Sequence, residues 1–266
     1  MKHAVALSLG LVIGGLGLLA ARSAVAAPVP AAEAAAKATP SAEELLTAMD
    51  GNLQFETRTA VIQMDVSDGR RTRSYEMISF GRGESDSAIE YRSPEREKGT
   101  RMLKLGDQLW MYMPRAERTQ KISGHMMRQG MMGSDVSYED MMTGSDFAQQ
   151  YDAVVLGSEV VDGRLHWKVE AKAKDTTVTY PRRLIWIDDG YRIPTKQELF
   201  ALSGMLMKTW TMSDVQNVEG QMMPMRMEIR DALREGSSTV IVTTELKLGV
   251  ALEDEVFSKR WLERSQ

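Results

Sequence analysis

Methionine is the residue type whose number and spacing stand out in this chain. There are 20 methionines among 266 residues; nine lie between Met102 and Met142, and seven lie between Met205 and Met227. The thioether is flexible and polarizable, so it suits a surface that repacks around varied apolar groups, and it is also a soft ligand for Cu(I). The methionines therefore allow three interpretations: ordinary core packing, an adaptable lining for acyl chains, or a copper site around His125.

Groups for catalysis are scarce. The chain has no cysteine, which excludes disulfides, thiolate metal sites and cysteine nucleophiles. Only His125 and His166 follow the N-terminal apolar segment, and the sequence holds no nucleophile elbow, P-loop or HExxH helix. We therefore expect a protein that is not an enzyme, uses no cofactor and holds no metal, with Cu(I) binding as the less favoured alternative.

The first 26 residues are typical of a secretory signal peptide. Lys2 and His3 precede an apolar stretch, and Ala24-Val25-Ala26 has the small-x-small pattern that signal peptidase recognises. Residues 27–40 are rich in alanine and proline and are predicted to form a flexible leader. The sequence thus predicts cleavage after Ala26, a periplasmic location and one folded domain over residues 41–266.

Hydrophobic periodicity predicts the elements of this domain. Ser41 and Glu44 have capping-box spacing before an apolar stripe, so we expect a helix that ends near Phe55. From Arg58 onward the period is two, and His166 falls on the polar, solvent-facing side of its strand. After the strand that begins at Arg58, the predicted strands are 72–80, 87–92, 100–105, 108–113, 151–161, 164–174, 182–188, 195–202, 205–215, 222–230 and 239–248.

These elements indicate a mainly β protein. Residues 114–150 show no sustained alternation and are expected to be irregular, with a short helix near their end, and residues 253–264 are expected to form a short docking helix. A sheet of about a dozen strands curls to cover its apolar face. We predict a strongly curved, incompletely closed antiparallel β-barrel with an N-terminal helix and a helical or irregular lid.

Two stretches of this sequence resemble a known family. Leu109–Pro114 (LWMYMP), followed by Arg118 to Ile122, and Met132–Met141 (MGSDVSYEDM) are similar to the signature of the outer-membrane lipoprotein-sorting protein-like family, relatives of the LolA/LolB carriers. The closing residues 254–263 are similar to the end of that family. The resemblance implies an open β-barrel with an apolar cavity under a lid. It also implies that the protein ferries lipid or lipid-modified protein through the periplasm, often beside RND/MMPL-type transporters.

The cavity and the lid can be assigned to residues. In strand 108–113, Met111 and Met113 share one face, and we expect that face to line the cavity beneath a lid at 123–147. The predicted ligand-binding residues are Met102, Leu109, Trp110, Met111, Tyr112, Met113, Met126, Met127, Met131, Met132, Met141 and Met142. The predicted structural residues of the lid are Gly133, Ser134, Asp135, Tyr138, Glu139 and Asp140, with Ser134 capping a short helix.

The function predicted from the sequence is a periplasmic, non-catalytic carrier that transfers a lipid or an acylated lipoprotein toward the outer membrane. An accessory subunit of an RND/MMPL-type inner-membrane transporter, or a sensor, is the alternative of a different class. Nucleic acid is not expected as a partner, because the formal net charge is −4 and phosphate binding requires clustered Lys and Arg.

Overall fold

A single antiparallel sheet of 13 strands dominates the computed structural model, which describes residues 38–143 and 146–264. The predicted signal peptide lies outside the described residues, and every element below belongs to the unit that begins at Pro40. The strands are β1 (Thr57–Ser67), β2 (Thr72–Arg82), β3 (Asp86–Ser93), β4 (Arg101–Leu105), β5 (Gln108–Met113), β6 (Arg118–Ile122), β7 (Tyr151–Val161), β8 (Arg164–Ala173), β9 (Arg182–Asp188), β10 (Pro194–Phe200), β11 (Leu206–Val218), β12 (Gln221–Asp231) and β13 (Ser238–Leu248). The helices are α1 (Ala42–Leu53), α2 (Tyr138–Met142), α3 (Phe147–Gln150) and α4 (Lys259–Glu263), with 3-10 helices at Pro114–Ala116, Gly124–Arg128, Met131–Gly133 and Asp254–Phe257.

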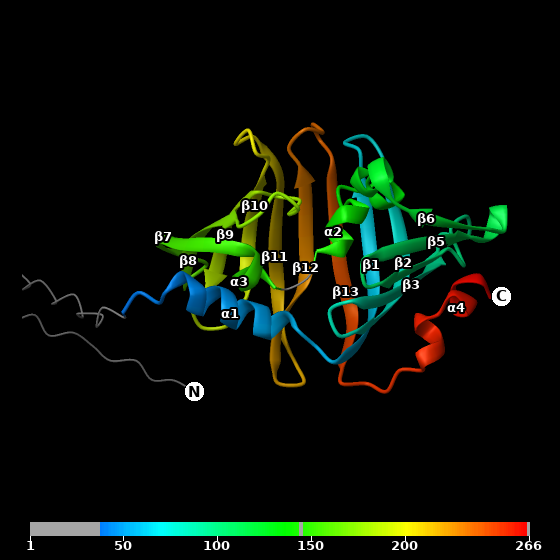
Figure 1. Cartoon of the computed structure of the whole chain (residues 1–266), viewed down its shortest axis with the longest axis horizontal. Helices are drawn as coiled ribbons and strands as arrows, with labels where there is room; N and C mark the ends of the chain where they lie inside the picture. The colour runs from blue at the N-terminus through cyan, green and yellow to red at the C-terminus, as the bar shows by residue number, and fades with distance from the viewer. Residues whose placement is uncertain (1–37, 144–145, 265–266) are drawn as a thin grey trace, which may run out of the picture. The chain divides into compact units, whose positions relative to one another are not determined.

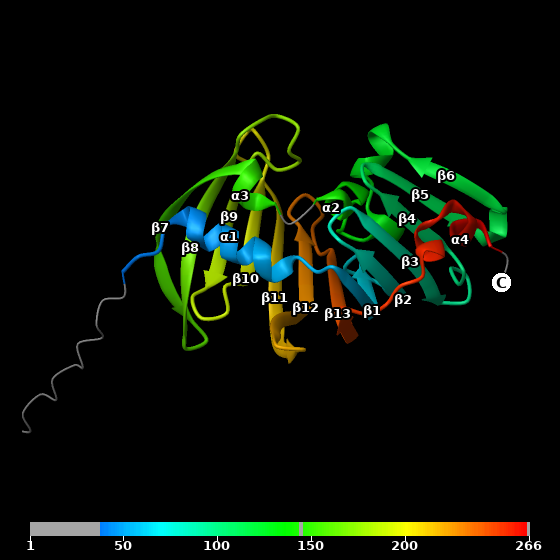
Figure 2. The same ribbon diagram turned by 60° about the horizontal axis from the view of Figure 1, so that its bottom comes forward.

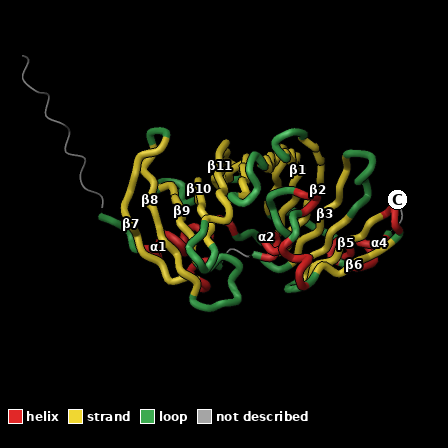
Figure 3. Tube along the Cα trace, turned by 90° about the horizontal axis from the view of Figure 1, so that it is seen from above, coloured by secondary structure: helices red, strands yellow, loops and turns green. Residues whose placement is uncertain are grey.

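The sheet consists of two meanders that meet at its centre. The strand order is β6-β5-β4-β3-β2-β1-β13-β12-β11-β10-β9-β8-β7, so β1 pairs with β13 and the chain passes from one sheet edge to the other between β6 and β7. Figure 3 shows the strands as an arc with α2 on its concave side. Among the described residues, no hydrogen bonds join β6 to β7, which confirms the predicted curved and incompletely closed barrel.

Hydrophobic residues cover both ends of the arc. On the concave face α1 lies across the β7–β9 end (Figure 1), where Leu45, Leu46 and Met49 pack against buried residues of β8 and β9. The capping box of Ser41 and Glu44 is present as predicted. On the convex face α4 lies beside β3–β5 (Figure 2), where it buries Trp261 and Leu262 against the sheet.

A buried ion pair holds the C-terminal helix in place. The Arg101 guanidinium lies 3.3 Å from the Glu90 carboxylate, and its Nη1 donates to the carbonyl of Arg264 at 2.6 Å. The positive charge therefore lies at the carboxyl end of α4, where unpaired carbonyls collect.

Strand β6 was not predicted from the hydrophobic periodicity. Every predicted strand overlaps an observed one, but β6 falls in the stretch expected to be irregular. Its five residues, Arg-Thr-Gln-Lys-Ile, include a single apolar side chain, because an edge strand of this kind buries only Ile122. Edge strands are often short and charged, so the alternation that marks inner strands is missing.

The prediction for His166 was wrong. Its side chain is 3% exposed rather than solvated. Nδ1 lies 2.9 Å from the Arg164 carbonyl, and Nε2 lies 3.8 Å from the Asp188 carboxylate. The Arg164 guanidinium also stacks on the Tyr191 ring at 3.7 Å. Long polar side chains thus bury the imidazole on a face that alternation marks only as polar.

The other edge strand, β7, is long and apolar. Val154, Leu156 and Val160 are exposed, and the pairing register with β8 shifts between Val155 and Gly157.

Within the described residues no helix is long and apolar enough to cross a membrane.

We predict that Asp50 of α1 makes folding stability depend on pH. Its carboxylate accepts a hydrogen bond from the Ala148 backbone at 2.9 Å, and burial raises its pKa from 3.8 to about 6. Between these two pKa values the folded protein keeps a proton that the unfolded chain has lost, so this contribution falls as pH rises, by at most about 3 kcal/mol. Urea denaturation should show that the free energy of unfolding decreases less between about pH 4 and about pH 7 in Asp50→Asn than in wild type. Equal decreases would contradict the prediction.

Candidate ligand-binding cavity

The methionine-rich segment packs onto the concave face of β1–β5. Met102, Leu109, Met111, Met131 and Tyr138 are buried there in one cluster with residues of β1, β2 and β3. Partly buried methionines pack against this cluster; they are Met113, Met126, Met127, Met132, Met141 and Met142. The structure therefore brings the predicted methionines together. Most of them form a packed layer under and within residues 123–143, which follow β6 and cover this part of the concave face; we call these residues the covering segment.

Two predicted ligand-binding residues lie on the other side of the sheet. Trp110 and Tyr112 belong to the convex cluster with Trp261 and Leu262, because side chains alternate along β5. The two aromatic residues contact the region of α4 and do not reach the methionine face.

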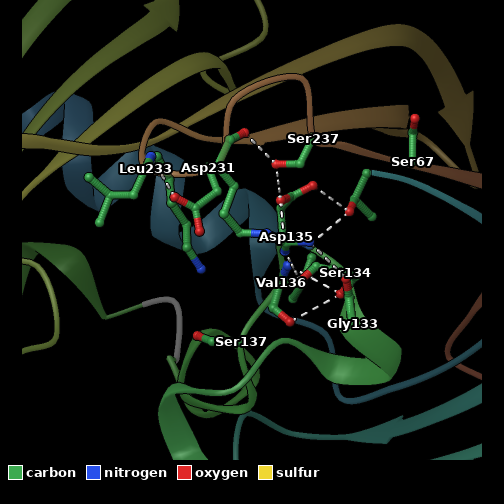
Figure 4. Close-up of polar contacts among 12 residues, drawn as sticks. Ser67, Gly133, Ser134, Asp135, Val136, Ser137, Asp231, Leu233 and Ser237 are labelled. Carbon is green, nitrogen blue, oxygen red and sulfur yellow. Dashed lines mark hydrogen bonds and ion pairs between the residues drawn. The ribbon is translucent and has the colours of Figure 1, made fainter. Parts of the chain in front are cut away.

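Asp135 anchors the covering segment to the β12–β13 hairpin. Its side chain is fully buried and accepts hydrogen bonds from Ser237 Oγ at 2.7 Å and Thr239 Oγ1 at 2.9 Å (Figure 4). Arg234 Nη1 lies 3.2 Å from the same carboxylate, and the Asp135 backbone N–H donates to Thr239 Oγ1. A carboxylate that is out of water needs such donors, so this loop is fixed to the sheet.

Asp140 forms the second anchor. Its carboxylate accepts a hydrogen bond from Tyr180 Oη at 2.6 Å, and it forms a buried ion pair with Lys208 of β11. Burial, and next the Asp140 charge, raise the pKa of Tyr180 above its ordinary value, so the phenol stays a donor. The segment that crosses from β6 to β7 is thus tied to β11 as well as to the hairpin.

The predicted cap of α2 was one turn too early. Ser137, not Ser134, is the N-cap: its hydroxyl accepts from Asp140 N at 3.1 Å, and the Asp140 carboxylate accepts from Ser137 N at 2.7 Å. Ser134 is used in a local turn with Val136. Gly133 has a φ of 76°, a left-handed conformation that favours glycine.

A cavity of about 260 Å³ opens on the concave face where the two concave clusters approach each other. Strands from both meanders contribute to its wall, including β1, β4, β9, β11 and β12. Its apolar lining residues are Leu53, Met141, Phe147, Pro194, Trp210, Met212, Pro224 and Met227. Its charged lining residues are Arg58, Glu84, Asp86, Lys104, Asp140 and Arg183.

Few predicted site residues line this cavity. Asp140 and Met141 do, while Met127, Glu139 and Met142 line a neighbouring cavity of about 390 Å³ that shares Arg183 with the first. The second methionine cluster of the sequence supplies Met212 and Met227. That methionine cluster is the sequence feature that could have indicated this part of the wall. Arg58, Lys104 and Trp210 lie too far apart in the sequence for a motif to link them.

Across residues 38–143 and 146–264, no group of three or more His, Asp or Glu side chains is placed to hold a metal ion. The copper alternative, which involves thioethers, stays a prediction. The lining combines flexible apolar side chains with a few fixed charges, as in ordinary sites for amphipathic small molecules.

We predict that Asp135→Ala destabilises the protein, because Ser237, Thr239 and Arg234 lose a common acceptor. The free energy of unfolding should fall by about 2–3 kcal/mol, measured by urea denaturation. Asp152→Ala removes an exposed carboxylate whose nearest cation, Lys174, is 4.0 Å away, and should change it by less than about 0.5 kcal/mol. Equal effects of the two substitutions would contradict the anchoring role of Asp135.

Solved structures share this fold over most of the chain. A DUF1329 family protein from Desulfovibrio piger matches with a TM-score of 0.77 at 24% identity, covering 83% of this chain and 97% of that one. A putative outer membrane lipoprotein-sorting protein domain from Vibrio parahaemolyticus matches with a TM-score of 0.74 at 22% identity, covering 84% and 98%. A LolA superfamily protein from Nitrosomonas europaea matches with a TM-score of 0.69 at 26% identity, covering 84% and 100%.

The two sequence comparisons gave one match between them. No curated protein matches the chain significantly. A family model described as "Uncharacterized protein" matches residues 83–264, which is more than half of the chain and includes both stretches that resemble the lipoprotein-sorting signature. The chain belongs to the family that this model describes, and it shares the LolA-like fold of the solved structures.

Proposed function

We propose that this protein is a non-catalytic carrier that binds a lipid, or the acyl chain of a lipid-modified protein, in the concave cavity. The observation that carries the proposal is the cavity wall itself, where apolar side chains of β10, β11 and β12 converge beside Met141 of the covering segment. An acyl chain gains about 0.8 kcal/mol for each CH₂ group that it buries, so binding needs no chemistry.

The size of the cavity suits a slender ligand. Its 260 Å³ lies just below the range of about 300–1,000 Å³ for small-molecule sites. Met141, Met212 and Met227 line it, and methionine side chains can move aside because they are unbranched and have three rotatable bonds. The same wall therefore accepts chains of different shape, which a carrier requires.

The carrier is proposed to act in the cell envelope and to deliver its ligand toward the outer membrane. The family supports this direction, since one structural neighbour is a putative outer membrane lipoprotein-sorting protein domain. The signal-like residues 1–26 support export to the periplasm. A cavity that binds by burial alone releases its ligand when a partner offers a more favourable apolar site.

We predict that protein purified from its native periplasm carries its ligand in stoichiometric amount, as measured by mass spectrometry of organic extracts. Met227→Glu places a carboxylate in the cavity wall, where an acyl chain cannot solvate it, and should deplete the extracted lipid or acylated peptide at least about tenfold. Met205→Glu changes an exposed methionine outside the wall and should leave the amount unchanged.

An extract no richer than that of an unrelated periplasmic protein would contradict constitutive carriage. Equal depletion by the two substitutions would remove the cavity from the proposal.

A further inference from the structure

The cavity wall holds three cations that have no carboxylate partner among the described residues. These are Arg58 of β1, Lys104 of β4 and Arg183 of β9. Arg183 is satisfied by neutral groups, since it donates to Tyr151 Oη at 2.7 Å and to Gln197 Oε1 at 3.2 Å. Lys104 has a single neutral partner, and Arg58 has none among the described residues.

Arg58 is a largely desolvated guanidinium with no hydrogen bond or ion pair to any described residue. Its side chain lies across Gly81 of β2, where a Cβ atom would come within 2.9 Å of Nε. Glycine at position 81 therefore provides the room that keeps the guanidinium at the cavity. Burial lowers the pKa of Arg58, yet an arginine stays protonated in proteins, so the charge remains.

Lys104 adds a second positive charge close to the first. It is 8% exposed, and its ammonium donates to the Glu84 carbonyl at 3.1 Å. Burial lowers the pKa of Lys104 and the charge of Arg58 lowers it further, whereas the charges of Asp107, Asp86 and Glu84 raise it. Arg58 and Lys104 both line the cavity, so both positive charges face the same space. Two like charges held partly out of water are costly, and an anion between them offsets that cost.

Among the described residues, no acid of the wall forms an ion pair with Arg58 or Lys104. Asp86 is paired with Arg82 at 2.9 Å, and Asp140 is paired with Lys208. Glu84 is exposed to solvent. The indole Nε1 of Trp210 also lines the wall as a buried donor with no acceptor among the described residues. The wall therefore holds two donors, the Arg58 guanidinium and Trp210 Nε1, that no described residue satisfies.

We propose that the ligand is an anionic amphiphile, whose carboxylate or phosphate head lies at Arg58 and Lys104 and whose chain lies along Trp210, Met212 and Met227. This inference rests on the proposed carrier function and adds the head group to it. Charge-assisted hydrogen bonds to a desolvated guanidinium are strong, so the head group sets the preference while the chain supplies the bulk of the burial.

The test compares two fluorescent probes with the same chain, cis-parinaric acid and its methyl ester, on the delipidated full chain. Wild type should bind the acid at least about tenfold more tightly than the ester. Arg58→Gln and Lys104→Gln should each bring the two affinities within about threefold of each other, while ester binding persists and reports an intact cavity. Arg96→Gln removes a cation whose side chain is 80% exposed and should keep the wild-type preference.

Competition distinguishes the two sources of the head group. Dodecanoic acid and dodecyl phosphate should both displace parinaric acid from wild type, and the tighter of the two identifies a carboxylate or a phosphate head. Dodecanol should displace it weakly.

The outcomes separate the two proposals. Equal binding of acid and ester by wild type, or an unchanged preference in Arg58→Gln, overturns the anionic head group and leaves the carrier function standing. Failure of both probes to bind overturns the carrier function and the head group together.

Discussion

The covalent connection between the two edge strands constrains the rest of this structure. Since β1 pairs with β13, the two meanders share the centre of the sheet, and the chain that leaves β6 must travel to the opposite edge before β7 begins. That connection crosses the concave face and so decides what the face can hold. An irregular backbone in such a place needs polar partners, and Asp135 and Asp140 provide them at fixed points of the sheet. The stretch Met132–Met141, predicted to have a structural role in the lid, therefore attaches this connection to the sheet.

The attachment of this connection to the sheet explains where the methionines pack on the concave face. Those of the crossing segment and of β4 and β5 pack on one another, and they fill one half of the concave face. Helix α1 and α3 fill the other half. The cavity lies between the methionine cluster and the helices α1 and α3. Its wall comes from strands that are distant in sequence. Its polarity follows from the same geometry, because Asp140 and Asp135 of the connection pair with Lys208 and Arg234, and among the described residues neither pairs with Arg58 or Lys104.

Periodicity and resemblance sufficed for the architecture but not for the site. The period-two pattern located the inner strands because each buries one face, and the capping box located α1. The period-two pattern did not predict β6, which buries a single residue. It also gave the wrong environment for His166, where long polar side chains replace solvent. Ser134 was mistaken for a cap because two serines stand three residues apart before acidic residues, and only the backbone shows which one begins α2. The cavity wall depends on which strands face each other across the arc, and no local pattern records that.

The open barrel leaves β7 with a free row of backbone donors and acceptors, beside exposed Val154, Leu156 and Val160. Such an edge invites another chain to add a strand, which is the first step of aggregation. The register shift between Val155 and Gly157 breaks the regular spacing near the middle of the strand. An incoming strand can follow only half of the edge before its hydrogen bonds fall out of step. The irregularity in β7 therefore makes this open edge a poorer template for the addition of further strands.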